Sequence, residues 1–136
     1  MHKIMALDVG KKRIGVALSD FLHILATPCQ VVARNPQNEA IEEIKKIAIE
    51  NRVETIVVGL PYNMDGTVGA QAQDCIEFSS LLKNDFVVVY EDERLTSFEA
   101  EENLKRAGKN YTKNKGLVDM ESACIILQQY LSRKDK

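Results

Sequence analysis

Four acidic residues stand where a carboxylate can do chemistry. Asp8 follows a short apolar run and precedes Gly10, which permits a tight turn at little steric cost. Asp92–Glu93 follow another apolar run, and Asp119 lies in the last predicted helix. A carboxylate fixed at the end of a strand can bind a metal ion or a phosphate-bound metal ion. These acids are the candidates for a functional site.

Asp119 shares one face of the last predicted helix with apolar side chains. Spacings of four, three and four residues align it with Ala123, Ile126 and Tyr130. An acid on a core-facing stripe is costly unless a partner satisfies it, and a Lys, an Arg or a metal ion can be that partner. The simpler alternative is an acid near the helix start that complements the helix dipole.

Oxygen ligands without clustered His or Cys suit Mg²⁺ or Mn²⁺ better than zinc. One or two such ions can activate water and stabilise the leaving oxygen when a phosphodiester is hydrolysed. Each acid alone can be a turn or salt-bridge residue. The convergence of Asp8, Asp92 or Glu93, and Asp119 from separate elements is the stronger argument for a metal site.

Basic residues accompany these acids and can contact the phosphates of a nucleic acid. Three of them flank Asp8, and the rest fall in residues 103–118, which contain no acid. A solvated basic loop is the alternative for the second group. The candidates are Lys11, Lys12, Arg13, Lys105, Arg106, Lys109, Lys113 and Lys115.

Hydrophobic patterning predicts the elements that position these residues. The strand at 55–60 has no polar alternation, and both it and the strand at 85–90 are expected to be buried. Thr96 or Ser97 can cap a helix before the last one. In chain order we expect strands at 3–8, 13–19 and 27–34, a helix starting after the break at Asn35–Asn38, a strand at 55–60, a helix at 72–82, a strand at 85–90, a capped helix, and a helix at 117–133.

This order predicts an α/β fold with a mixed five-stranded sheet flanked by helices. The first three strands form an antiparallel unit, and two β-α crossovers place the last strands parallel to the first. Ligands bind at the carboxyl ends of parallel strands in such sheets. Asp8 and Asp92–Glu93 both belong to that edge.

The bulk properties narrow the class of protein. A chain of 136 residues is expected to form a single domain over 1–136. The net charge of −2 argues against strong polyanion binding by the whole surface, but not against a local basic patch.

Cys29, Cys75 and Cys124 are interpreted as reduced core thiols. No apolar run approaches the roughly 20 residues of a membrane span, and the chain start resembles no signal peptide, so we expect a cytoplasmic protein without membrane partners.

The motifs together resemble the YqgF family of RuvC-like nucleases, also called RuvX. The segment Asp92-Glu93-Arg94-Leu95-Thr96 and the Gly-Leu-Pro-(x)₃-Asp-Gly segment are specific in combination. The matching segments cover nearly the whole chain in order: Leu7–Asp20, Val57–Pro61 with Met64–Gly66, Asp92–Ser97, and Val118–Asp119 with Ala123 and Ile126–Gln128.

This resemblance implies a ribonuclease H-like fold and metal-dependent hydrolysis of structured nucleic acid. The implied substrate is the 5′ end of the precursor of 16S ribosomal RNA, or alternatively a branched DNA junction. Junction resolution requires two active sites and so a dimer, whereas end trimming does not. The implied oligomeric state is accordingly a monomer or a weak homodimer.

The resemblance also implies roles for single residues. Asp8 corresponds to the first metal ligand and Asp119 to the ligand on the last helix. RuvC-like enzymes place a further acid at the end of the fourth strand, but this chain has Gly59-Leu60-Pro61 there. Glu93 or Asp92 must then supply that ligand from the neighbouring strand. Arg94 is expected to contact a phosphate or orient an acid, with a salt bridge to Glu91 or Asp20 as its alternative.

Two other classes of function compete with a nuclease. Asp8-Val9-Gly10 before a hairpin also resembles the phosphate loop of actin-like ATPases, but these proteins need two such domains, and 136 residues leave no room for the second. A non-catalytic nucleic-acid or protein-binding module can use the same fold. Such a module is expected to lack the acids, and this chain has them.

Overall fold

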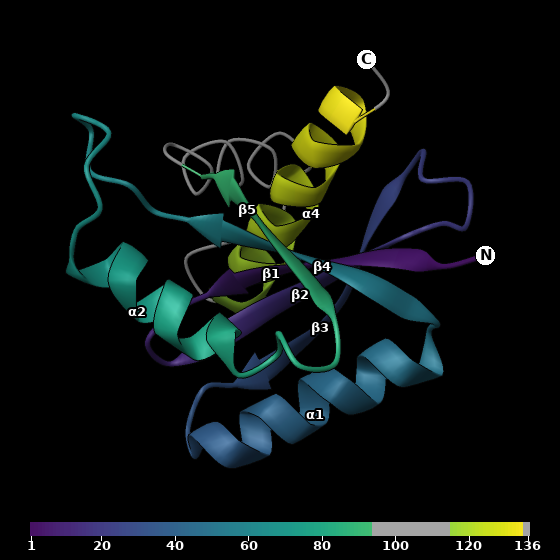
Figure 1. Ribbon diagram of the computed structural model, residues 1–136, viewed down its shortest axis with the longest axis horizontal. Coiled ribbons are helices and arrows are strands. Elements are labelled where there is room, and N and C mark those ends of the chain that lie inside the picture. The colour runs from purple at the N-terminus through teal and green to yellow at the C-terminus, as the bar shows by residue number, and fades with distance from the viewer. Residues whose placement is uncertain (94–114, 135–136) are drawn as a thin grey trace.

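The computed structural model describes residues 1–93 and 115–134. It is an α/β fold with one five-stranded sheet, as the sequence predicts (Figure 1). The helix expected from Thr96 or Ser97 lies outside the described residues. The elements are β1 (Lys3–Val9), β2 (Arg13–Ser19), β3 (Ala26–Ala33), α1 (Gln37–Glu50), β4 (Val53–Leu60), α2 (Ala70–Ser80), β5 (Val87–Asp92) and α4 (Lys115–Lys134).

The strand order in the sheet is β3-β2-β1-β4-β5. β1 pairs with β2, and β2 with β3, in antiparallel fashion, while β4 runs parallel to both β1 and β5. This confirms the predicted antiparallel unit followed by parallel strands. The carboxyl ends of β1, β4 and β5 therefore meet at one edge of the sheet.

Helices cover both faces of the sheet (Figure 1). Met5 and Leu7 of β1 join the core under α1 and α2, whereas Ile4 and Ala6 join the core under α4. Side chains alternate between the two faces of a strand. Asp8 is the next residue in the second series, so its carboxylate lies on the α4 side at the end of β1.

The prediction that residues 85–90 form a buried strand is wrong in two respects. β5 begins at Val87, and it lies at the edge of the sheet with β4 as its partner. Val87 is 53% exposed, and only Glu91 of this strand is fully buried. An edge strand with apolar residues has the same sequence pattern as a central one, because the pattern does not report how many neighbours pair with it.

The three thiols differ in burial. Cys75 in α2 and Cys124 in α4 are buried, as predicted, whereas Cys29 on β3 is only half-buried. All three are free. In the part of the chain that the structure describes, no helix has the length and apolar character to cross a membrane.

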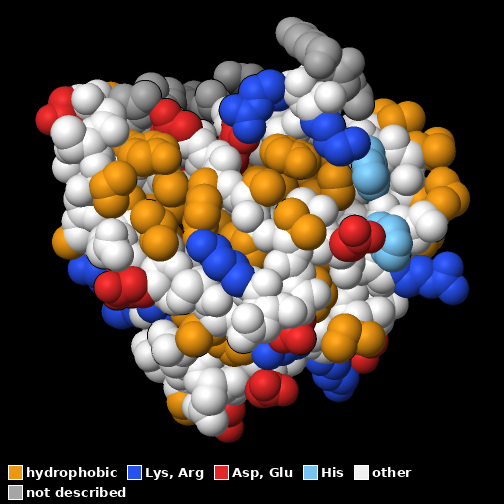
Figure 2. Space-filling model, viewed as in Figure 1, with side chains coloured by type: hydrophobic (Ala, Val, Ile, Leu, Met, Phe, Trp, Pro, Cys, Tyr) orange, Lys and Arg blue, Asp and Glu red, His pale blue; other side chains and the backbone are white. Residues whose placement is uncertain are grey.

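The loop between β2 and β3 presents large apolar side chains to solvent. Figure 2 shows hydrophobic groups at the edge of the molecule beside the two histidines. The Asp20 carboxylate accepts the backbone N–H groups of Ile24 and Leu25, at 2.7 and 3.3 Å, which fixes the loop backbone. The exposed side chains are Phe21, Leu22, Ile24 and Leu25.

Candidate active site

Gly15 brings the last helix down onto the first hairpin. It pairs with Asp8 across the β1–β2 ladder. A Cβ atom at this position would lie 2.1 Å from the carbonyl oxygen of Asp119, so only glycine lets the start of α4 rest on β2. Asp119 therefore lies close to Asp8, although the two residues are far apart in the sequence.

Glu93 occupies the place where the fourth strand lacks an acid. Its backbone N–H donates to the Leu60 carbonyl at 3.1 Å, which extends the β4–β5 pairing by one residue. A Cβ atom at Gly59 would lie 2.8 Å from Glu93 Oε2, so this carboxylate fills the space above the glycine. Asp92 is exposed. The structure thus places Glu93, and not Asp92, over the end of β4.

The carboxyl groups of Asp8 and Glu93 lie against each other. The pKa of Asp8 is raised to about 6, chiefly by burial and also by the charge of Asp119, while hydrogen bonds from Glu93 and from the Ser122 hydroxyl act in the opposite direction. The pKa of Glu93 is raised to about 9, chiefly by burial and also by the charge and hydrogen bond of Asp8. Protonated Glu93 then donates to the Asp8 carboxylate. Two acids in this arrangement need a shared proton or a cation.

Asp119 lies beside this pair but is held by a different partner. Arg13 Nε donates to Asp119 Oδ2 at 2.8 Å, and the two side chains are 36% and 22% exposed. An arginine is thus one of the partners that the sequence analysis allowed for Asp119. Within residues 1–93 and 115–134, no three acidic, His or Cys side chains form a group arranged to hold a metal ion.

Ser122 is a site residue that the sequence analysis missed. It is 1% exposed, and its hydroxyl oxygen makes no hydrogen bond of standard geometry within the described part of the chain. The hydroxyl is still near enough to Asp8 to lower that group's pKa. Ser122 follows Asp119 by three residues, which is the spacing of neighbours on one helical face, and this spacing was the available signal.

These groups fit a divalent cation with oxygen ligands. Among the described residues, no cation neutralises the paired carboxyls of Asp8 and Glu93, and the buried Ser122 hydroxyl makes no hydrogen bond of standard geometry. Carboxylate and hydroxyl oxygens are hard ligands of the kind that Mg²⁺ and Mn²⁺ prefer. No sulfur or imidazole ligand is needed.

A second network fixes the turn between β1 and β2. Arg34 donates to both carboxylate oxygens of Asp74, at 2.8 and 2.9 Å, and to the Gly10 carbonyl at 3.0 Å. Its guanidinium lies 4.6 Å from the centre of the Phe78 ring. Arg34 is buried, and a buried arginine is expected to have an acidic partner.

The predicted phosphate contacts are only partly described. Lys11 and Lys12 are exposed on the turn beside Asp8, where they can meet a ligand. Arg13 is the partner of Asp119. Lys115 begins α4, but its side chain is not described. The remaining candidates lie outside the described residues: Arg94, Lys105, Arg106, Lys109 and Lys113.

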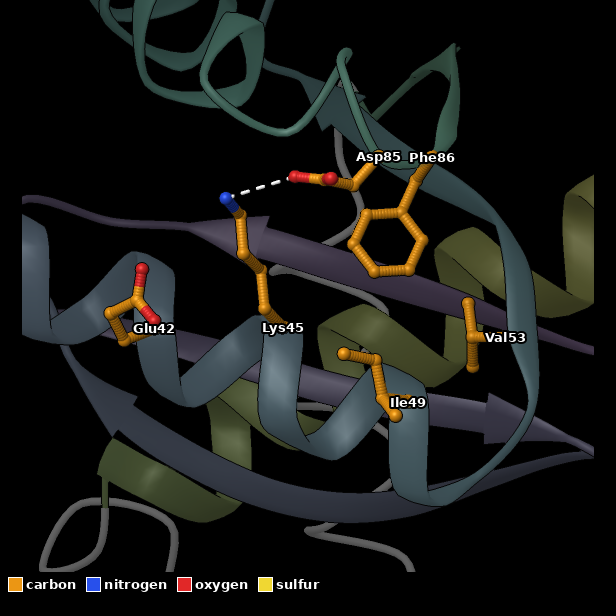
Figure 3. A pocket seen from close by; sticks show the side chains of 6 residues that line it. All are labelled: Glu42, Lys45, Ile49, Val53, Asp85 and Phe86. Carbon is orange, nitrogen blue, oxygen red and sulfur yellow. Dashed lines mark ion pairs between the residues drawn. The ribbon is translucent and has the colours of Figure 1, made fainter.

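A surface groove of about 460 Å³ lies away from these acids (Figure 3). Val53 begins β4, and Phe86 precedes β5, so the groove lies at the amino ends of these strands. Lys45 and Asp85 form an ion pair of 2.9 Å across it. The groove is lined by Glu42, Lys45, Ile49, Val53, Asp85 and Phe86, and none of these is a predicted site residue.

Solved structures with the same fold include two resolvases. The RuvC protein of T. thermophilus in complex with a Holliday junction superposes with a TM-score of 0.57 at 12% identity, covering 99% of this chain and 96% of that one. The resolvase of Fowlpox virus, with Holliday junction DNA, gives a TM-score of 0.60 at 11% identity and covers 98% and 99%. At this identity the likeness concerns the fold alone, and it confirms the RuvC-like architecture.

Sequence relatives are much closer. A protein of Gloeothece citriformis named "Putative pre-16S rRNA nuclease" is 44% identical over 132 residues, which cover 96% of this chain and 87% of the relative. A protein of Clostridioides difficile with the same name is 43% identical over 134 residues, covering 97% and 95%. The family model RuvX, described as Holliday junction resolvase, matches residues 2–133. The chain therefore belongs to the RuvX family of nucleases, the family that its sequence motifs resemble.

Proposed function

We propose that this chain is a divalent-metal-dependent nuclease with Asp8, Glu93 and Asp119 as its metal ligands. The observation that carries the proposal is the Asp8–Glu93 carboxyl pair at the carboxyl ends of β1 and β5, where burial raises both pKa values and the charge of Asp8 adds to the rise at Glu93. Strongly shifted acids that share one site are typical of functional centres. Membership of a nuclease family supports the same reaction class.

The acids of the site have distinct tasks in this proposal. Asp8 and Glu93 hold the ion, and Asp119 joins them from α4. Ser122 orients the Asp8 carboxylate from the buried side. When bound, one or two Mg²⁺ or Mn²⁺ ions neutralise the charge that develops on the phosphate oxygens and lower the pKa of the attacking water.

The basic groups near the acids position the substrate. Lys11 and Lys12 lie on the turn that Arg34 fixes, so the backbone that carries them is held relative to Asp8. Their ammonium groups can bind the phosphates that flank the bond to be cut. Arg94, Lys105, Arg106, Lys109, Lys113 and Lys115 remain candidates for the rest of this nucleic-acid contact.

The substrate we propose is the 5′ end of precursor 16S rRNA, processed in the cytoplasm. The names of relatives at 43–44% identity support it. The second candidate is a four-way DNA junction, which the description of the RuvX family model favours. Metal-assisted hydrolysis does not itself read the 2′-hydroxyl, so the site's acids are compatible with both.

A side-by-side cleavage assay tests the proposal. A 5′ fragment of precursor 16S rRNA and a four-way DNA junction are incubated with Mg²⁺, Mn²⁺ or EDTA, using wild type and Asp8→Asn. We expect metal-dependent cleavage of the RNA by wild type and none by Asp8→Asn. Cleavage of the junction alone would transfer the proposal to the second candidate. Equal cleavage by wild type and Asp8→Asn would contradict a site at Asp8.

The oligomeric state separates the two substrates further. End trimming works with one active site, so we propose a monomer or a weak homodimer. Symmetric junction cleavage needs two sites in one particle. Sedimentation of the protein with each substrate measures the number of chains per complex.

A further inference from the structure

Arg13, which the sequence predicts to contact a phosphate, forms an ion pair with Asp119, a predicted metal ligand. Its Nε–H donates to Asp119 Oδ2 at 2.8 Å, and this contact joins the β1–β2 hairpin to α4. Both side chains are partly exposed. The carboxylate that must help to hold a cation is therefore already neutralised by a cation of the protein.

The backbone around this pair leaves only the side chains free to rearrange. The carbonyl of Asp119 rests against Gly15, and the Arg13 carbonyl accepts the Gly10 N–H at 2.9 Å. Asp119 nevertheless lies near enough to Asp8 for its charge to act on that carboxyl group. Asp119 therefore lies between two groups, the Arg13 guanidinium and the Asp8 carboxyl, while its backbone rests on β2.

We propose that Arg13 is an exchangeable counter-ion of Asp119, released when a divalent cation takes this carboxylate and then available to a phosphate of the nucleic acid. The inference rests on the proposed function, because it requires a cation at Asp8 and Glu93. It explains why the acids do not form a closed ligand group within the described residues. It also assigns Arg13 two successive partners, a carboxylate and a phosphate.

The ion pair between Arg13 and Asp119 is of a kind that can exchange partners. Ion pairs between partly exposed side chains are weak, so a divalent cation can displace the guanidinium. A guanidinium binds carboxylates and phosphates with the same planar set of donors, and it stays charged when released. Metal binding and nucleic-acid binding must then be coupled, since each favours the released state of Arg13.

Side-chain NMR tests the release directly. The Arg13 Nε–H signal, assigned by its absence in Arg13→Gln, is followed while Mg²⁺ is added to the wild-type protein. We expect it to shift and to lose protection from solvent exchange at the metal concentration that fills the site. A signal that stays unchanged at saturation would overturn the inference and leave the proposed function intact. No metal binding by wild type would overturn both.

Metal affinity gives a second readout with a matched control. Arg13→Gln removes the competitor and is expected to bind Mn²⁺ more tightly than wild type, by up to about fivefold. Lys12→Gln removes one charge from the same turn without touching Asp119, so it measures the effect of charge alone. Weaker Mn²⁺ binding by Arg13→Gln, or an equal gain in both variants, would contradict competition for the carboxylate. If Arg13→Gln does not fold, Arg13→Met removes the same competitor while it keeps the apolar length of the side chain.

The coupling to nucleic acid distinguishes the two basic residues. Affinity for an RNA hairpin is measured with EDTA and with saturating Ca²⁺. We expect Lys12→Gln to weaken binding by a similar factor in both conditions. Arg13→Gln should weaken binding only with Ca²⁺, because without metal Arg13 is engaged with Asp119. An equal loss in both conditions would show that Arg13 does not change partners.

Discussion

At the scale of single residues, Asp8 and Glu93 are arranged for binding rather than for stability. Burial raises the pKa of both carboxyl groups. Asp8 raises the pKa of Glu93 further through its charge and its hydrogen bond, whereas the hydrogen bond from Glu93 lowers the pKa of Asp8. At neutral pH the metal-free protein must keep a proton or tolerate repulsion at this position. Replacing one acid should therefore relieve a cost that the folded state carries.

Asp8→Asn is expected to stabilise the metal-free protein at pH 8. The amide removes the buried charge of Asp8, which is poorly solvated and lies near that of Asp119, and the gain should be roughly 1–3 kcal/mol, or about 3–10 °C in Tm. Differential scanning calorimetry in EDTA measures it. The same variant should lose the rise in Tm that Mn²⁺ gives to wild type. A lower Tm for the metal-free variant would contradict a destabilising charge at Asp8.

The pH dependence of stability follows from the same pair. Folding raises the pKa of Asp8 from 3.8 to about 6 and that of Glu93 from 4.5 to about 9. The folded protein then binds more protons than the unfolded one, so stability falls as the pH rises from about 4 to about 9. Urea unfolding in EDTA across this range should show a steeper fall for wild type than for Asp8→Asn. Parallel curves would contradict the shifted pKa values.

The sequence identifies the acids better than it identifies their partners. Position at strand ends was enough to select Asp8 and the Asp92–Glu93 pair, because strand ends follow from local patterning. The distinction within the pair depends on Gly59 of the neighbouring strand, where the absent side chain leaves room for Glu93. The contact between Arg13 and Asp119 spans 106 residues, so no local pattern reports it.

At the scale of elements, α4 reaches the site because β2 carries no side chain at its crossing point. Gly15→Ala would place a methyl group 2.1 Å from the Asp119 carbonyl oxygen. We expect a loss of about 3 kcal/mol in the free energy of unfolding, because backbone cannot move aside as a flexible side chain can. Urea unfolding followed by circular dichroism measures it. A change below about 0.5 kcal/mol would show that α4 does not rest on β2.

The turn between β1 and β2 depends on Arg34 in a similar way. Arg34→Gln removes the double contact with Asp74 and the hydrogen bond to the Gly10 carbonyl, and it should cost about 2 kcal/mol in stability. The control is Lys45→Gln, which breaks the more exposed ion pair with Asp85 and should change the unfolding midpoint little. Equal effects would mean that Arg34 forms only a surface ion pair.

Some features of the helices and strands could be predicted from the sequence pattern, and others could not. The strands and their directions could be predicted because hairpin turns and β-α crossovers restrict the topology. The edge position of β5 could not, because its apolar residues pack on one strand and on helices instead of on two strands. The half-buried Cys29 belongs to the other edge strand, β3, and was misjudged for the same reason.

At the scale of the whole molecule, the carboxyl ends and the amino ends of the parallel strands carry different groups. The carboxyl ends of β1 and β5 carry Asp8 and Glu93, with Lys11 and Lys12 on the adjoining turn. The amino ends of β4 and β5 carry the groove beside α1. Because the chain has a net charge of −2, its overall electrostatic field does not attract a polyanion. The local basic groups must therefore bind it. We therefore expect bound nucleic acid to cover the edge of the sheet where β1 and β5 end.

The rates at which Glu93→Gln and Asp92→Asn cleave a 5′ fragment of precursor 16S rRNA test whether Glu93 is a metal ligand of the active site. Both variants replace a carboxyl group by an amide in neighbouring residues, but only Glu93 lies over Gly59 and against Asp8. Under single-turnover conditions with saturating Mg²⁺ or Mn²⁺, Glu93→Gln should lower the rate at least about 100-fold, and Asp92→Asn only a few-fold. A Glu93→Gln variant that cleaves as fast as wild type would contradict the assignment of this site.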